Sequence, residues 1–159
     1  MARYAATTQV PVETTRQEIE TLLKRRGATR LLHGWAADGR ALLAFEMEGR
    51  QVRLLLRMPD RMDREFTHDA SGKERTTAKA QSFYEQAERQ RWRALLLIIK
   101  ARFEAIDAGI TTLEREFLAD VVLPDGQSLG DAIRPQIESA YQTGNMPPLL
   151  PHFGQSGER

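Results

Sequence analysis

Histidine, cysteine and paired carboxylates most often carry catalysis or bind metals, and this sequence offers few of them in useful patterns. It contains no cysteine, which excludes disulfides, thiol nucleophiles and cysteine-ligated zinc or iron–sulfur clusters. Its three histidines, His33, His68 and His152, fall in separate segments, and no two have the spacing of metal ligands. We interpret His33 as an ordinary strand residue rather than a base or ligand.

Two further patterns in the sequence could form sites. Glu116 and Asp120 are four residues apart, so on a helix they would share a face and, with Glu114, could hold a hard cation. A solvated acidic face near a helix start explains the same residues, and we favour that interpretation. The segment 71–73, Ser-Gly-Lys, lacks the upstream glycine of a phosphate-binding loop. The sequence therefore indicates no metal, cofactor or catalytic group, and we expect a non-enzymatic protein.

The distribution of charge is more informative than any single motif. Residues 50–102 contain 13 Lys or Arg and 7 Asp or Glu, a net charge of +6, and residues 103–159 contain 3 and 9, a net charge of −6. Either the two regions face each other and cancel, or a basic face is presented to an anionic partner. The sequence alone leaves both alternatives open.

Basic and aromatic residues in two places are the candidate nucleic-acid contacts. One group recurs at helical spacing in and around RQRWRALLLIIK, and the other is expected on the outer face of a strand. Proteins that hold single-stranded nucleic acid use arginines for the phosphates and aromatic rings for the bases. The competing interpretations are a solvated helix face and tryptophans at the edge of the core. The candidate contacts are Arg53, Arg57, Arg89, Arg93, Lys100, Trp35 and Trp92.

The N-terminal half predicts one helix followed by a three-stranded meander. Thr15 and Glu18 fit a capping box that opens a helix over about 15–26. Strand-like runs follow at 29–36, 40–48 and 51–58, and Asp38-Gly39 is typical of the tight turn between the first two. Alternation places one set of apolar side chains on the buried face of this sheet: Leu43, Phe45, Val52, Leu54 and Leu56.

The C-terminal half predicts helices. Residues 59–76 are polar and are expected to form a mobile loop, and the absence of Pro and Gly from 77 to 108 predicts one long helix. Its run Ala94–Ile99 is apolar on all sides, which indicates burial in a protein core and argues against a membrane-surface helix. A capping box at Thr111 opens a short helix, Ser128 caps another, and Pro135 begins a last helix that ends at Gly144.

These elements predict a single α+β domain over residues 1–151 with a flexible tail at 152–159. The helices are expected to pack on one face of the antiparallel sheet, with Leu95, Leu96, Ile98 and Ile99 against it. No apolar run approaches the length that spans a membrane, and the N-terminus has no secretory signal pattern, so we expect a cytoplasmic protein.

Three stretches, RWRALLLIIKARFEAIDAGI, EFLADVVLPDG and MPPLLP, resemble a group of small uncharacterised proteins encoded by bacteriophages and integrated bacterial mobile elements. The resemblance extends from VPVETT to PPLLP and rests on apolar and turn residues. It implies a place in the biology of a mobile element but no particular activity and no site residues.

Two functions are consistent with these observations. The first is a nucleic-acid-binding accessory protein of a phage or mobile element, whose basic residues contact the phosphates of a single strand. The alternative is an interaction or inhibitor module that binds a host or phage protein, or a second copy of itself, through the acidic C-terminal third, the MPPLLP segment or the outer sheet face. A large exposed apolar patch, with the arginines held in internal pairs, would favour the alternative.

Overall fold

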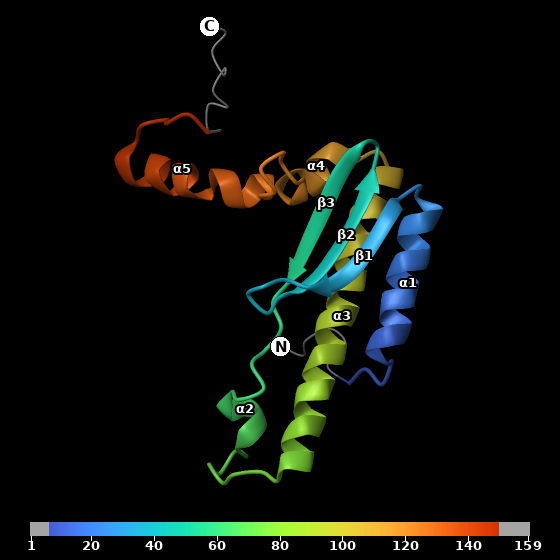
Figure 1. Ribbon diagram of the computed structural model, residues 1–159, viewed down its shortest axis with the longest axis vertical. Coiled ribbons are helices and arrows are strands. Elements are labelled where there is room, and N and C mark those ends of the chain that lie inside the picture. The colour runs from blue at the N-terminus through green and yellow to red at the C-terminus, as the bar shows by residue number, and fades with distance from the viewer. Residues whose placement is uncertain (1–6, 150–159) are drawn as a thin grey trace, which may run out of the picture.

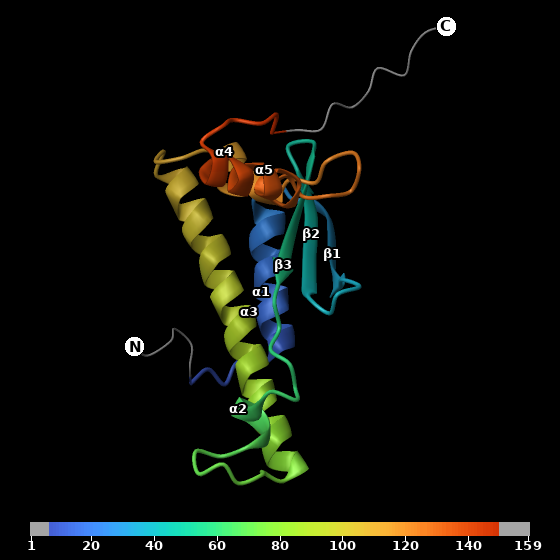
Figure 2. The same ribbon diagram turned by 90° about the vertical axis from the view of Figure 1, so that its left-hand side faces the viewer.

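The computed structural model describes residues 7–149 and has the α+β fold that the sequence predicts. An antiparallel sheet with strand order β1-β2-β3 lies against helices α1 and α3, which run side by side behind one face (Figures 1 and 2). Helix α5 projects from the top of the molecule, across the direction of α3 (Figures 1 and 2). The elements are α1 (Val12–Arg25), β1 (Thr29–Trp35), β2 (Ala41–Met47), β3 (Arg50–Leu56), α2 (Arg64–Thr67), α3 (Thr77–Asp107), α4 (Leu113–Phe117), the 3-10 helix η1 (Leu118–Asp120) and α5 (Leu129–Thr143).

The register of the sheet produces the predicted buried face. Leu43 lies opposite Leu54 and Phe45 lies opposite Val52, so these four side chains point to the same side, and all four are buried. Leu56 is half-buried at the end of the strand. The helices close this core with large aromatic and aliphatic side chains: Ile19, Leu23, Trp92, Leu95, Leu96, Ile99, Phe103 and Phe117.

The first helix begins three residues earlier than expected. Pro11 precedes it, and its φ of −56° is already close to that of a helix. Thr15 lies inside the helix, is buried and donates its hydroxyl hydrogen bond to the Pro11 carbonyl at 3.4 Å. The predicted capping box at Thr15 is therefore wrong, because this threonine fills a core position.

Helix α3 has 31 residues and closely matches the predicted bounds. The Thr76 side chain caps it by accepting a hydrogen bond from the Lys79 amide. Within the run 94–99, Leu95, Leu96 and Ile99 are buried, but Leu97 is 39% exposed and Ile98 is 48% exposed. The prediction that this run is buried on all sides, with Ile98 in the core, is wrong.

The segment 59–76 contains more structure than a plain loop. It forms helix α2, and an isolated antiparallel bridge joins His68 to Glu74. Phe66 of α2 is buried against Tyr84 of α3, with ring centroids 5.8 Å apart in an edge-to-face arrangement. This contact fastens the segment to the N-terminal half of α3.

The C-terminal elements differ from the expectation in their number and caps. Thr112, and not Thr111, caps α4. Ser128 caps α5 as expected, but this helix continues to Thr143 with Pro135 inside it, so the two predicted helices are one. Gly144 ends the helix in the left-handed conformation, with φ of 72°. The expected tail at 152–159 and the end of the MPPLLP segment lie outside the described residues.

The start of α5 is seated closely on η1. A β-carbon at Gly130 would lie 3.0 Å from the Ala119 carbonyl oxygen and 3.2 Å from the Ala119 β-carbon. Only glycine allows this approach without a shift of one backbone. Val121, directly after η1, forms an isolated antiparallel bridge with Val52, which ties this region to the free edge of β3.

Candidate functional site

Neither tryptophan lies where the nucleic-acid hypothesis requires it. Trp92 is 1% exposed, and the guanidinium of Arg16 covers its ring at 4.6 Å from the centroid, so no base can stack on it. Trp35 is 54% exposed, but it pairs with Ala41 and therefore lies on the same side of the sheet as the core. Arg53 pairs with Ala44 and points to the other side. If the outer sheet face bound a single strand, Trp35 would have to lie beside Arg53, and this expectation is wrong because the two residues are on opposite faces.

The three helical cations do not form one free ridge. Arg93 donates a hydrogen bond of 2.8 Å to Glu18 of α1. Arg89 donates two hydrogen bonds, of 3.1 and 2.6 Å, to the side-chain oxygen of Gln86 one turn earlier. Lys100 is exposed and lines a shallow cavity between α1 and α3 together with Arg25. The two arginines thus have partners within the fold, and Lys100 is separate from them.

Arg53 and Arg57 lie on the outer sheet face, at a hollow between the sheet and α5. Two adjoining cavities, of about 200 and 600 Å³, share Arg40, Leu55 and Arg134 in their walls. We call this space the arginine hollow and define it by its four arginines, which are Arg40, Arg53, Arg57 and Arg134.

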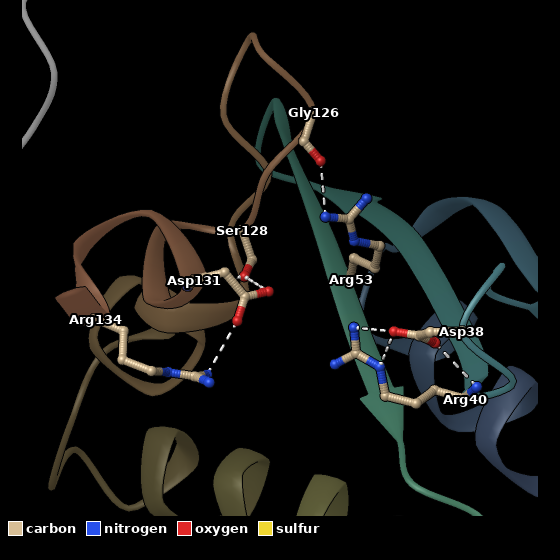
Figure 3. A network of polar contacts seen from close by, with 7 residues as sticks. All are labelled: Asp38, Arg40, Arg53, Gly126, Ser128, Asp131 and Arg134. Atoms are coloured by element: carbon tan, nitrogen blue, oxygen red, sulfur yellow. Dashed lines mark hydrogen bonds and ion pairs between the residues drawn. The ribbon is translucent and has the colours of Figure 1, made fainter.

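Three of these arginines are held in place by neighbouring groups (Figure 3). Arg40 donates from Nε to Asp38 at 2.7 Å, and this hydrogen bond lowers the pKa of Asp38 below its ordinary value, so the carboxylate stays ionised. Arg134 donates to Asp131 at 3.0 Å. Arg53 reaches the Gly126 carbonyl at 2.7 Å, in the loop that precedes α5. The exposed Arg57 has no hydrogen bond or ion pair within residues 7–149.

Sequence reasoning found half of this hollow. Arg53 and Arg57 follow from strand alternation, because residues two apart share a face. Arg40 and Arg134 come from the β1–β2 turn and from α5, and around each of them there is a local Asp–Arg pair. Arg40 begins the predicted strand 40–48, and alternation puts it on the outer face beside the third strand, although sequence reasoning did not select it. Nothing in the spacing places α5, and with it Arg134, beside β3.

The basic and acidic regions of the chain partly compensate each other. Arg50 pairs with Glu114, and Arg102 pairs with Asp120 at 2.7 Å, so two ion pairs join the +6 segment to the −6 segment. Arg26 of α1 also reaches the C-terminal third, where it forms two hydrogen bonds with the Asp107 carboxylate. The compensating interpretation of the charge pattern therefore holds for these arginines.

Exposed apolar side chains occur on several elements, including α5 and the part of α3 that the core leaves uncovered. On α5, Ile137 is 40% exposed and Tyr141, one turn later, is 89% exposed. None of the 15 residues of this helix is buried, although its apolar and polar residues lie on different faces. Leu97 and Ile98 are the exposed apolar residues of the α3 run described above.

Residues 7–149 show no arrangement typical of a metal site: no three His, Asp or Glu side chains come together to hold an ion. Helices within the same range are too short or too polar to cross a membrane. No protein-family model matches the sequence, and neither the curated proteins nor the solved structures gave a significant match.

Proposed function

We propose that this chain is a non-catalytic protein-interaction module and that α5 is its contact element. The observation that carries the proposal is a 15-residue amphipathic helix with no buried residue. Helices in proteins gain most of their stability by packing an apolar face against other elements. Here Ile137 and Tyr141 occupy successive turns and are exposed, so a partner can cover them.

The position of α5 suits this function. It is anchored at its start, where Gly130 meets Ala119, and the rest projects from the body of the molecule (Figure 1). Its apolar face resembles that of peptides that bind as a helix in a groove, where residues three or four apart are the anchors. The proposed partner is a protein of the host cell or of the mobile element that the resemblance implies, and the proposed compartment is the cytoplasm.

A cross-linking experiment tests the contact face directly. Two variants of the chain are made: one carries a photoreactive amino acid in place of Ile137, and the other carries it in place of Gln142. At 3.6 residues per turn these positions are about 140° apart around the helix. We expect the Ile137 protein to cross-link one defined species in an extract of its cells of origin. The partner should then be purified and should bind the unmodified chain saturably.

The Gln142 protein is the matched control, because it has the same photoreactive group on the polar face of the same helix. Equal cross-linking from both positions would remove the support for a specific contact face. Formation of a cross-linked dimer of this chain would instead identify the partner as a second copy.

Nucleic-acid binding stays as a second candidate because four of the five proposed cations have no carboxylate partner among the described residues. Arg57 and Lys100 are exposed without an ion pair in this part of the chain. Arg53 bonds a carbonyl, and Arg89 bonds the Gln86 amide oxygen. Fluorescence anisotropy with labelled single- and double-stranded oligonucleotides, repeated over a salt series, tests this function. Binding through these residues requires an affinity that falls with salt, at a log–log slope of about −0.7 per phosphate neutralised on a single strand.

A further inference from the structure

The arginine hollow has more positive charge than its own carboxylates balance. Four arginines line it, and the carboxylates in its walls are Asp38, Asp120 and Asp131. The first is paired with Arg40 and the third with Arg134, while Asp120 is paired with Arg102 from α3. Arg53 and Arg57 are therefore left without a carboxylate, and the hollow has an excess of two positive charges.

The Arg53 side chain carries a donor that the fold does not use. One terminal nitrogen donates to the Gly126 carbonyl, but Nε is buried and has no hydrogen-bond partner among the described residues. A buried donor without a partner is costly, and such groups are satisfied in most proteins. Because Nε is not accessible from the hollow, the donors that Arg53 offers to a ligand are those of its terminal nitrogens.

The guanidinium groups and the net charge of the hollow restrict the ligand. Arginine presents a planar set of N–H donors that matches the oxygens of carboxylate and phosphate groups. The two parts of the hollow, of about 200 and 600 Å³, have room for an oxyanion and for the organic group that carries it. Charge then separates the candidates, because a carboxylate or a phosphate diester has one negative charge, and a phosphate monoester has about −1.5 to −2 at pH 7.

We propose that the arginine hollow binds a phosphate monoester group. The excess of two positive charges matches that group, and the second terminal nitrogen of Arg53, which donates no hydrogen bond within the described residues, is a donor for one of its oxygens. Arg40 and Arg134 approach the hollow from opposite walls, each already oriented by an aspartate (Figure 3). Arg134 belongs to α5 and lies about one turn before Ile137, but the other three arginines come from β3 and the adjoining turn and strand ends. The two proposals use different ligands in their tests, so either can fail without the other.

The test is a titration of the full chain, labelled with ¹⁵N, with inorganic phosphate and with phenyl phosphate. The arginine Nε–H resonances are followed while sodium chloride keeps the ionic strength constant. We expect saturable shifts that include the Arg53 Nε–H resonance. The affinity should decrease as the pH is lowered from about 7 to about 5, because the phosphate monoester is protonated with a pKa near 6 and loses one negative charge. Acetate and dimethyl phosphate, titrated in the same way, should bind about tenfold more weakly because they have fewer charges.

Three arginine-to-glutamine variants test whether phenyl phosphate binds in the arginine hollow. Arg57→Gln and Arg134→Gln should each weaken the binding of phenyl phosphate by about tenfold, the loss expected for one charge-assisted hydrogen bond. Arg57 is exposed and without a partner within the described chain, so its replacement tests the site without a risk to folding. Arg64→Gln, on α2 at the far end of the molecule, removes the same charge and should leave the binding unchanged (Figure 1).

Three outcomes would overturn the proposal. The first is that the Nε–H shifts rise linearly with phenyl phosphate, as they do with added chloride, and do not saturate. The second is that phenyl phosphate binds Arg57→Gln, Arg134→Gln and Arg64→Gln with the same affinity. The third is equal binding of acetate and phenyl phosphate, which would mean a general anion site.

An oligonucleotide with a 5′-phosphate should also bind the hollow more tightly than the same strand with a 5′-hydroxyl. Equal binding of the two strands would assign the arginines to the diester backbone instead.

Discussion

At the residue scale, the burial of each tryptophan depends on which side of its helix or strand the core occupies. Trp92 sits among arginines in the sequence, and that context is typical of a solvated helix end. In the fold its ring belongs to the same core as Phe103, and Arg16 of α1 lies over it. The sequence could not reveal this, because the residue that covers Trp92 lies 76 positions earlier in the chain.

Replacement of the two tryptophans by alanine is therefore expected to lower the free energy of unfolding by very different amounts. Trp92→Ala deletes a fully buried aromatic side chain and should reduce the free energy of unfolding by about 3–5 kcal/mol. Trp35→Ala removes a side chain that is more than half exposed, and it should change the free energy much less. Urea unfolding of both variants measures the difference, and similar losses would contradict the assignment of Trp92 to the core.

The pair formed by Arg26 and Asp107 makes stability depend on pH. The hydrogen bonds from Arg26 lower the pKa of Asp107 below its ordinary value of 3.8. Because the pKa is lower in the folded state, this stabilisation is present above the unfolded value and is lost as the pH falls through the folded value. We expect the urea midpoint to fall as the pH is lowered from about 5 to about 2.

Replacement of either partner should reduce this pH dependence. Asp107→Asn and Arg26→Gln each remove the pair, so each variant should lose less stability than the unmodified chain between those two pH values. Urea midpoints measured at several pH values provide the comparison. If both variants kept the full pH dependence, the pair would not be its source.

At the element scale, helix α3 shows what a hydrophobic pattern can and cannot predict. The absence of Pro and Gly correctly located the helix. The continuous apolar run suggested burial on all sides, but the sheet and α1 cover only the side that contains Leu95, Leu96 and Ile99. How many neighbours surround a helix is a property of the whole fold, and the composition of one helix does not specify it.

Two neighbouring isoleucines on α3 test whether the apolar run is buried on one side only. Ile99 is fully buried, so Ile99→Ala should cost about 2–5 kcal/mol of unfolding free energy. Ile98 is nearly half exposed, and Ile98→Ala should stay within about 1 kcal/mol of the unmodified chain. Chemical denaturation of the two variants under identical conditions makes the comparison. Equal costs would mean that the run is buried on both sides after all.

Helix α5 shows a second limit of local signals. The Ser128 cap and the Gly144 stop were both predicted correctly. The sequence predicts a new helix at Pro135 because proline suits a first turn and lacks the amide that a helix interior requires. The structure keeps one helix through it, so the apolar face of α5 is longer than the sequence suggested.

At the scale of the whole molecule, the fold class and the meander followed from the sequence, and the site did so only in part. Turn residues and alternation located all three strands because those signals are local. Arg40 and Arg53 come together through the local pairing of β2 with β3, but the arginine hollow also requires Arg134 of α5, which lies far from both in sequence. Such a meeting is decided by the docking of Gly130 on Ala119 and of Val121 on Val52.

The whole-molecule charge pattern also bears on function. The basic middle and acidic C-terminal regions are joined by Arg50–Glu114 and Arg102–Asp120, so part of the apparent basic surface is used inside the fold. The surface that remains includes the apolar face of α5 and the exposed part of α3, together with the exposed cations Arg57 and Lys100. The arginines paired inside the fold are not free to contact phosphates, which favours a protein as the proposed partner.

The most direct test of this account uses the partner that cross-links to Ile137, whether that is another protein or a second copy of this chain. Its affinity is measured for two variants of this chain that carry the same added charge at different positions of α5. Ile137→Arg places a charge in the middle of the proposed contact face, and Gln142→Arg places the same charge on the polar face of the same helix. We expect Ile137→Arg to weaken binding by about 30-fold or more, as for a central interface residue, and Gln142→Arg to leave it nearly unchanged. Equal affinities for the two variants would contradict the assignment of α5 as the contact element.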